Sequence, residues 1–144
     1  MNKSTISVKN MLMLILIVII IIGLAAVVDF ILKLFRVQMC IQEQIKRVNN
    51  IEDLVAEVRE TGFPAIEYLK IDGVCTECIW YNGSVGFQQI EIKFKNAATT
   101  YPIKVSMPWD NVGGESCSDS LLQAGNTYTI EVQTNQIICH NCGV

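Results

Sequence analysis

An unbroken run of apolar residues close to the N-terminus constrains the fold of this chain more than any other feature. The run extends from Met11 to Val28 and contains 18 residues, MLMLILIVIIIIGLAAVV. As an α-helix with a rise of about 1.5 Å per residue, it would be roughly 27 Å long. That length is close to the thickness of the hydrocarbon core of a bilayer, about 30 Å. The run therefore predicts a membrane-spanning helix.

Charged residues stay rare beyond the run. Between its end and Phe35 only Asp29 and Lys33 are charged. They lie four residues apart with the acid first, which is the better orientation for an ion pair within a helix. Lys33 can also extend its ammonium group to the lipid headgroups. We therefore predict that the membrane-spanning helix covers residues 11–35 and follows a short basic N-terminal segment at residues 1–10.

Two other interpretations of the apolar run stay open. The first is a buried core helix, although a domain of about 110 residues is too small to surround such a rod. The second is a cleaved signal peptide, which has a basic start and small residues at its cleavage site. Lys3 and Lys9 provide the first feature, and Gly23-Leu24-Ala25 the second. Apolar residues continue past this site as far as Leu32, which favours a retained helix.

The helix is predicted to continue outside the membrane as an amphipathic helix at residues 36–62. Its apolar residues recur at steps of three, four or seven, which places them on one narrow face. Gly62 is suited to a helix C-terminal cap, and Pro64 cannot continue a helix. The alternative is two helices, with Asn50 as the N-cap of the second. The apolar face consists of Leu34, Val37, Ile41, Val48, Ile51, Val55 and Val58, widened by Ile45 and Leu54.

After Pro64 the apolar pattern changes to the alternation that is typical of β-strands. A change of phase at Gln88-Gln89 indicates a β-bulge, and pairs such as Asp72-Gly73 and Gly125-Asn126 indicate turns. Five to seven short strands with regular turns predict a small antiparallel β-sandwich at residues 65–144. The predicted fold class is therefore α+β. The alternating segments are residues 66–71, 85–87, 90–94, 101–107, 128–132 and 136–139.

Charge argues against nucleic acid as a partner. The chain has a formal net charge of −3. Beyond residue 36 it contains seven Lys or Arg residues and thirteen Asp or Glu residues, a net charge of −6. A nucleic-acid-binding surface needs a basic patch or stripe to neutralise phosphates, and this part of the chain has none in its sequence.

Six cysteines follow the apolar run. Cys75-Thr-Glu-Cys78 and Cys139-His-Asn-Cys142 are both CxxC pairs, and four thiolates from two such pairs can form a tetrahedral zinc site. However, the pairs are much further apart than in compact zinc ribbons. Redox catalysis is a second alternative, but it needs an activated thiolate. Structural disulfides are the favoured interpretation, with fifteen pairings open. The candidate cysteines are Cys40, Cys75, Cys78, Cys117, Cys139 and Cys142.

Cysteine usage also predicts where the C-terminal domain lies. Lysine and arginine residues flank the apolar run on both sides, so the positive-inside rule does not choose an orientation. Six cysteines on one side of the run suit an oxidising compartment. Asn82-Gly83-Ser84 is a glycosylation sequon in a turn-like stretch, which makes Asn82 a candidate glycosylation site. We therefore expect an extracytoplasmic domain, anchored in the membrane.

The β segments resemble an immunoglobulin-like module of prokaryotic surface proteins. The resemblance rests on Ile90–Asn96 (IEIKFKN), Tyr101–Val105 (YPIKV) and Leu122–Val132 (LQAGNTYTIEV), about a third of the chain. It implies an immunoglobulin-like arrangement for the predicted sandwich.

The whole layout is similar to that of type IV pilin-like subunits, especially archaeal pilins and archaellins. In that family a long N-terminal helix is apolar in its first half and amphipathic in its second, which packs on a β domain. Here the two halves are Met11–Val28 and Asp29–Thr61. Many members carry a glutamate near the start of the mature helix, whereas Met11–Ile22 contains no charged residue. The resemblance implies a filament core formed by residues 11–35, with assembly positions at Leu16, Ile20, Gly23 and Val27.

These observations favour a structural subunit of a cell-surface filament, whose partners are copies of itself and membrane lipid. The alternative is a single-pass anchored binding module or an accessory subunit of a membrane complex. Enzyme activity and a cofactor are not expected. His140 is the single histidine and cannot be combined with a convincing catalytic set, and Gly113-Gly114 lacks the context of a phosphate loop. Trp80 and Trp109 are expected to pack in the core or in turns.

Overall fold

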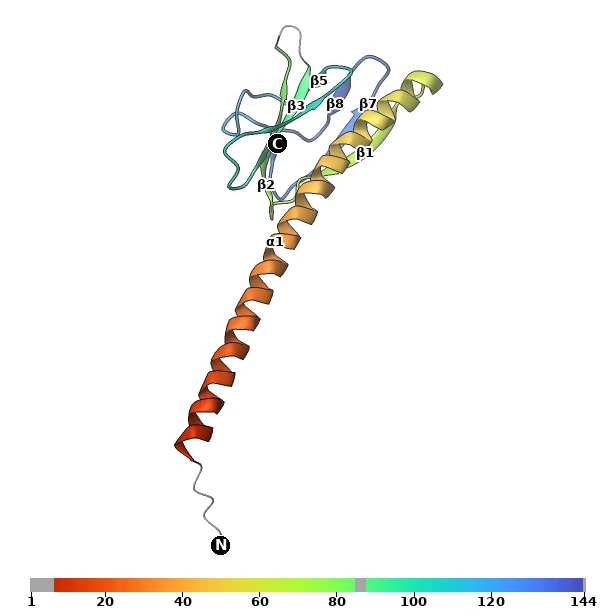
Figure 1. Cartoon of the computed structure of the whole chain (residues 1–144). Helices are drawn as coiled ribbons and strands as arrows, with labels where there is room; N and C mark the ends of the chain where they lie inside the picture. Colours follow the sequence, from red (N-terminus) through yellow and green to blue (C-terminus); the bar gives the residue numbers. More distant parts are fainter. Residues whose placement is uncertain (1–6, 85–87, 144) are drawn as a thin grey trace. The chain divides into compact units, whose positions relative to one another are not determined.

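The fold is α+β, with one long helix followed by short strands (Figure 1). This computed structural model describes residues 7–84 and 88–143. Helix α1 covers Val8–Thr61. Within the described ranges the strands are β1 (Ala65–Lys70), β2 (Thr76–Asn82), β3 (Gln89–Phe94), β4 (Tyr101–Lys104), β5 (Trp109–Asp110), β6 (Leu122–Gln123), β7 (Thr127–Val132) and β8 (Ile137–Cys139).

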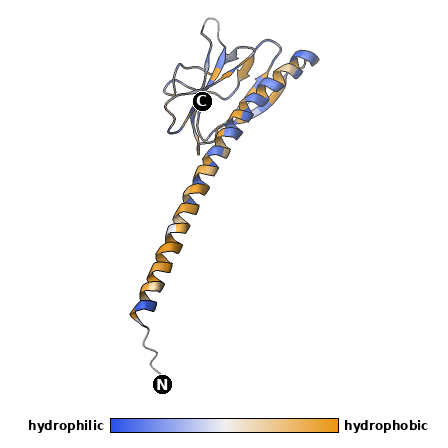
Figure 2. Cartoon of the chain, viewed as in Figure 1, coloured by the Kyte–Doolittle hydropathy of each residue, from blue (hydrophilic) through white to orange (hydrophobic). Residues whose placement is uncertain are grey.

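The structure comprises two compact units, Met1–Arg36 and Val37–Val144. The described part of the first unit is the apolar stretch of α1, which appears almost uniformly hydrophobic in Figure 2. Asp29 and Lys33 form the predicted ion pair there, with 2.8 Å between Oδ2 and Nζ. The length and composition of this stretch are compatible with a membrane span and with a signal sequence.

The predicted single helix is confirmed, because α1 continues through Asn49 and Asn50. It ends where the sequence indicated. Gly62 has a positive φ of 75°, and its N–H donates to the carbonyl oxygen of Val58 at 2.8 Å. Glycine is favoured in this left-handed conformation because it has no Cβ. The Thr61 hydroxyl also donates to the carbonyl oxygen of Glu57, one turn earlier, at 3.0 Å.

The second unit contains two small, mainly antiparallel sheets. The first has the strand order β1-β7-β8-β5 and the second the order β4-β3-β2-β6. In the first sheet β1 pairs with β7 along its whole length, from Ala65↔Val132 to Lys70↔Thr127. The predicted antiparallel pairing has one exception, because β5 pairs with β8 in parallel.

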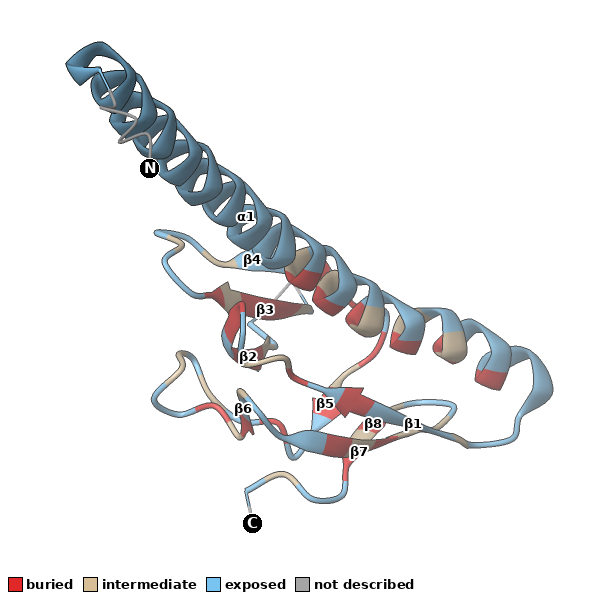
Figure 3. Cartoon of the chain, turned by 90° about the horizontal axis from the view of Figure 1, so that it is seen from below, coloured by how far each residue is buried: buried red, intermediate tan, exposed pale blue. Residues whose placement is uncertain are grey.

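Both sheets and the second stretch of α1 share one hydrophobic core. The first sheet contributes side chains such as Leu69 and Ile130, and the second such as Ile79 and Ile92. The helix contributes one buried face, seen as red bands in Figure 3. The predicted apolar face packs on this core, with Ile41, Ile45 and Leu54 partly buried against it. Its buried residues are Cys40, Gln44, Val48, Ile51, Val55 and Val58.

Helix α1 closes the open side between the two sheets. Strands β1 and β4 are edge strands of their sheets, and α1 is hydrogen-bonded close to both. Near the β1 side, Arg47 Nη1 donates to the carbonyl oxygen of Lys70 at 3.0 Å. Just beyond β4, Glu52 Oε2 accepts from the Ser106 N–H at 3.1 Å, and Arg59 Nη2 donates to the Ser106 carbonyl oxygen at 2.9 Å. These hydrogen bonds hold the helix beside the ends of the two edge strands.

The strand predictions hold best where alternation is clear. Strands β1, β3, β7 and β8 overlap predicted segments to within one residue at each end, whereas β4 ends at Lys104 instead of continuing to residue 107. Strands β2, β5 and β6 were not predicted. The irregular register lies between Thr76 and Cys78 of β2, not at Gln88-Gln89. The alternating residues 85–87 and the basic residue Lys3 lie outside the described residues.

Candidate functional site

The cysteines form three disulfides, as expected from their number and location. Cys40 of α1 bonds Cys75, with a Cα–Cα distance of 5.9 Å. Cys78 of β2 bonds Cys117, and Cys139 at the end of β8 bonds Cys142. These pairings join segments that are 35, 39 and 3 residues apart in the sequence. Two of them are therefore long-range crosslinks within the second unit.

The two CxxC pairs differ in their bonding. Cys75 and Cys78 bond different partners, whereas Cys139 and Cys142 bond each other. No cysteine is free, and a disulfide sulfur is not the thiolate ligand that zinc requires. Residues 7–84 and 88–143 contain no cluster of three or more His, Cys, Asp or Glu side chains able to hold a metal ion. The four-thiolate zinc arrangement is therefore not present.

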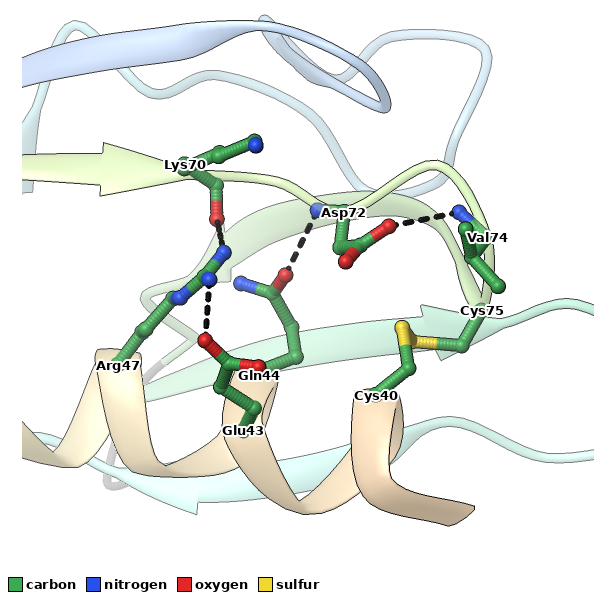
Figure 4. A network of polar contacts seen from close by, with 8 residues as sticks. All are labelled: Cys40, Glu43, Gln44, Arg47, Lys70, Asp72, Val74 and Cys75. Atoms are coloured by element: carbon green, nitrogen blue, oxygen red, sulfur yellow. Dashed lines mark hydrogen bonds and ion pairs between the residues drawn. A yellow bond between two sulfur atoms is a disulfide. The ribbon is translucent and has the colours of Figure 1, made fainter. Parts of the chain in front are cut away.

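The Cys40–Cys75 disulfide is part of a polar network that fastens α1 to the β domain (Figure 4). One turn after Cys40, Gln44 Oε1 accepts from the Asp72 N–H at 2.9 Å. Arg47 donates to Glu43 Oε1 at 2.5 Å as well as to the Lys70 carbonyl oxygen. Cys40, Gln44 and Arg47, on successive turns of the helix, thus hold the segment from Lys70 to Cys75.

Sequence reasoning missed Gln44 because it is polar, although it is only 1% exposed. The signal was its spacing, since residues 40, 44 and 48 continue the i, i+4 period of the buried face. Its Oε1 is bonded, but its Nε2 has no hydrogen-bond partner among the described residues. A buried donor without a partner costs roughly 1–3 kcal/mol. Gln44 therefore orients the Asp72 turn at a cost in stability.

The predicted assembly positions lie on the apolar stretch of the first unit. Leu16, Ile20 and Val27 are all more than half exposed within this chain. A Cβ at Gly23 would meet no atom within 4 Å. Large apolar residues around the rest of this stretch are exposed in the same way. The surface is therefore apolar over its whole circumference, and no single face is distinguished within one chain.

A contact between the surface side chains of His140 and Glu131 was not predicted. His140 Nε2 lies 2.5 Å from Glu131 Oε2, and Gln133 Nε2 donates to Glu131 Oε1 at 2.9 Å. The hydrogen bond from Gln133, followed by that from His140, lowers the pKa of the Glu131 carboxyl below its usual 4.5. Glu131 is in β7 and His140 follows β8, so pairing of these strands brings them together.

The remaining features are the two tryptophans, the Asn82 sequon and a surface depression. Trp80 and Trp109 are buried, as expected. Asn82 ends β2 and its Oδ1 accepts from the Ser84 N–H at 3.3 Å, so the sequon lies at a strand end. An open depression of about 520 Å³ is lined by residues that include Tyr128 and Asn141. Their polar groups are already bonded to the backbone of neighbouring segments.

Comparisons of the chain with protein-family profiles, with curated proteins and with solved structures return no match.

Proposed function

We propose that this chain is a structural subunit of a cell-surface filament, with its β domain outside the cytoplasm. The contrast between the two stretches of α1 carries the proposal. From Met11 to Phe35 the large apolar side chains are exposed all round, whereas from Cys40 to Val58 one face is buried in the β domain. An apolar helix surface without a polar face requires lipid or other apolar helices around it.

In this proposal the apolar helix surface contacts lipid before assembly and neighbouring copies of the chain after it. Inside a bilayer, the side chains pack as well on lipid as on another helix, so hydrophobicity alone does not drive assembly. Outside the bilayer, each Leu or Ile side chain removed from water contributes roughly 1.5–3 kcal/mol. A bundle of apolar helices is then strongly favoured. Leu16, Ile20, Gly23 and Val27 are proposed to lie in contacts between copies.

The second stretch of α1 supports a mechanical role. It fills the core between both sheets and is crosslinked to the Asp72–Cys75 turn by a disulfide. Force on the helix would therefore pass to the β domain through packing and a covalent bond. We also propose that the β domain is immunoglobulin-like. Two sheets around one core support it, while the parallel β5–β8 pair and the helix in the core are departures.

A monomeric membrane anchor for a binding or accessory module is the second candidate. The observation in its favour is the scarcity of small residues in the apolar stretch, where Gly23, Ala25 and Ala26 are the only ones. Close helix contacts within membranes usually rely on small residues. An apolar surface made mainly of isoleucine and leucine would suit lipid contact alone.

Matched charge substitutions in the two stretches of α1 test the proposal. Ile20→Asp places an unpaired carboxylate among apolar helices, so we expect it to abolish fibres while the β domain stays folded. Ile20→Leu is the control and should retain fibres. Val55 is 1% exposed in the core, so Val55→Asp should instead unfold the β domain, since burying such a charge costs several kcal/mol.

Negative-stain microscopy of surface preparations and circular dichroism of the purified chains would provide the two measurements. Fibres that contain the Ile20→Asp chain would contradict assembly through the apolar stretch. If the natural chain is monomeric in detergent and absent from every surface fibre, the monomeric anchor is the better explanation.

A further inference from the structure

Strand β1 carries large apolar side chains on the side that faces away from the core. Leu69 of this strand is buried in the core, and successive side chains of a strand point to opposite faces of its sheet. Ile66 and Tyr68 therefore point outward, and they are 59% and 66% exposed. A sheet with one solvated face normally has polar residues on that face. The outward side of β1 departs from this rule at two neighbouring positions.

Pairing with β7 extends this surface across a second strand. Each outward residue of β1 is opposite an outward residue of β7, because Tyr128, Ile130 and Val132 of β7 are buried. We call the six outward positions the outer face. They form the pairs Ile66↔Glu131, Tyr68↔Thr129 and Lys70↔Thr127. All six belong to the second unit of the structure.

Charge on the outer face is balanced, unlike charge on the domain as a whole. Seven basic and thirteen acidic residues follow residue 36, a net charge of −6, so two copies repel each other over most of their surfaces. The outer face has one basic residue, Lys70, and one acidic residue, Glu131. They lie at opposite ends of the face, with the Tyr68–Thr129 pair between them. A surface with this arrangement is complementary to a copy of itself.

A two-fold rotation about an axis that runs across the strands brings the opposite charges together. With this axis over the Tyr68–Thr129 pair, two outer faces stack as aligned sheets do, and their β1 strands run in opposite directions. Lys70 of each copy then lies over the row that contains Ile66 and Glu131 of the other. An axis along the strands would instead leave Lys70 and Glu131 of the two copies at opposite ends.

We propose that the outer face is a homophilic contact surface, through which the β domains of two copies of this chain pair face to face. The contact is isologous, so it closes after two copies and cannot extend a fibre. It is therefore separate from assembly through the apolar stretch of α1. Only its strengthening by many copies displayed together rests on the proposed filament.

The size of the outer face determines how strong one contact is. Six residues of strand are about 20 Å long, and neighbouring strands lie about 4.8 Å apart. The face is thus much smaller than the roughly 800 Å² that each partner buries in a standard stable interface. A single pair of chains therefore associates weakly, and a covalent crosslink is needed to detect it.

Site-directed crosslinking of the full chain in a mild detergent tests the pairing. The natural cysteines are all bonded, so an introduced cysteine provides the single free thiol. Thr129→Cys lies beside the proposed axis, about 10 Å from its counterpart in the facing sheet. A short bis-maleimide should therefore give a covalent dimer. Thr127→Cys is the matched control, because it lies in the same strand and is more exposed, yet is roughly 17 Å from its counterpart. Its dimer yield should be several-fold lower.

Further substitutions in the Thr129→Cys chain identify the contact. Tyr68→Ser should lower the dimer yield several-fold. Val74→Ser removes an apolar side chain that is 64% exposed but lies outside the outer face, and it should leave the yield unchanged. Lys70→Glu should also lower the yield, and the charge exchange Lys70→Glu/Glu131→Lys should restore it. Circular dichroism checks that each variant is folded.

Equal dimer yields from Thr129→Cys and Thr127→Cys would indicate random encounters and overturn the proposal. A yield that Tyr68→Ser leaves unchanged would do the same. Adding Ile20→Asp to the Thr129→Cys chain separates this contact from filament assembly. A retained dimer supports pairing of the β domains whether or not fibres form. Loss of the dimer with Ile20→Asp would show that the apolar stretch alone brings the copies together, and the homophilic surface would be excluded.

Discussion

Among single residues, Glu131 is the one whose ionisation is coupled most clearly to folding. Its carboxylate accepts hydrogen bonds from Gln133 and pairs with His140, and both lower its pKa. A carboxyl group with a lower pKa in the folded state stabilises that state when it is ionised. This contribution is fully present above the unfolded-state pKa near 4.5. It is lost as the pH falls through the lower, folded-state pKa.

We therefore predict that Glu131→Gln makes folding stability less dependent on pH between about pH 5 and pH 3. The natural chain loses this stabilising contribution on acidification, whereas the variant has no carboxyl to protonate at that position. Urea unfolding in a non-ionic detergent, followed by fluorescence of the buried Trp80 and Trp109, measures the change. Glu67→Gln removes an exposed carboxylate of β1 as the control. Equal pH dependence in all three chains would show that the pair contributes nothing.

At the scale of elements, the disulfides divide into long and short crosslinks. In the chain-entropy treatment, a crosslink over a separation like that of Cys40–Cys75 contributes about 4 kcal/mol, and one over three residues about 2 kcal/mol. The long crosslink also fastens α1 to a β turn. Its contribution should therefore be larger than that of Cys139–Cys142, which closes only the turn after β8.

We expect Cys40→Ser/Cys75→Ser to destabilise the β domain by roughly 2 kcal/mol more than Cys139→Ser/Cys142→Ser. Free energies of unfolding from denaturant titrations of the two double variants provide the comparison. Circular dichroism would show whether α1 keeps its helix content in each. Equal losses would mean that the loop-closure argument fails for this domain.

The elements also show what the sequence could and could not predict. Helix α1 was predictable because its apolar run and its Gly62 cap are local signals, and β7 because Tyr128, Ile130 and Val132 alternate. Strand β2 was missed because Cys78, Ile79 and Trp80 are buried in succession, which removes the alternation of a half-exposed strand. Strands β5 and β6 have two residues each, too few for any period.

The site was predictable only in part for a related reason. The number of cysteines indicated disulfides, but their pairing depends on distances between segments far apart in the chain. The Gln44–Asp72 contact depends in the same way on how α1 lies over β1. The apolar surface around Ile20 was predictable from composition alone. All residues from Met11 to Val28 are apolar, so a helix formed by them is apolar on every side.

For the whole molecule, the proposed membrane anchoring makes one property decisive, namely the side of the membrane on which the β domain lies. All six cysteines and the Asn82 sequon follow the apolar stretch. Disulfides form and persist in oxidising compartments. The disulfides therefore support the proposed external β domain. In the opposite orientation the crosslink that fastens α1 to the Asp72–Cys75 turn would be reduced.

We predict that synthesis of the chain into microsomes places Asn82 in the lumen and glycosylates it. The sequon is at the end of β2, with the Ser84 side of the turn exposed, and it is accessible before the domain folds. Gel mobility with and without an endoglycosidase measures the modification, and Asn82→Gln and Ser84→Ala should both abolish the shift. Added protease should leave the β domain intact until detergent is present. An unglycosylated chain whose β domain is digested in intact microsomes would show the opposite orientation, and the filament proposal would fail with it because the β domain would not reach the cell surface.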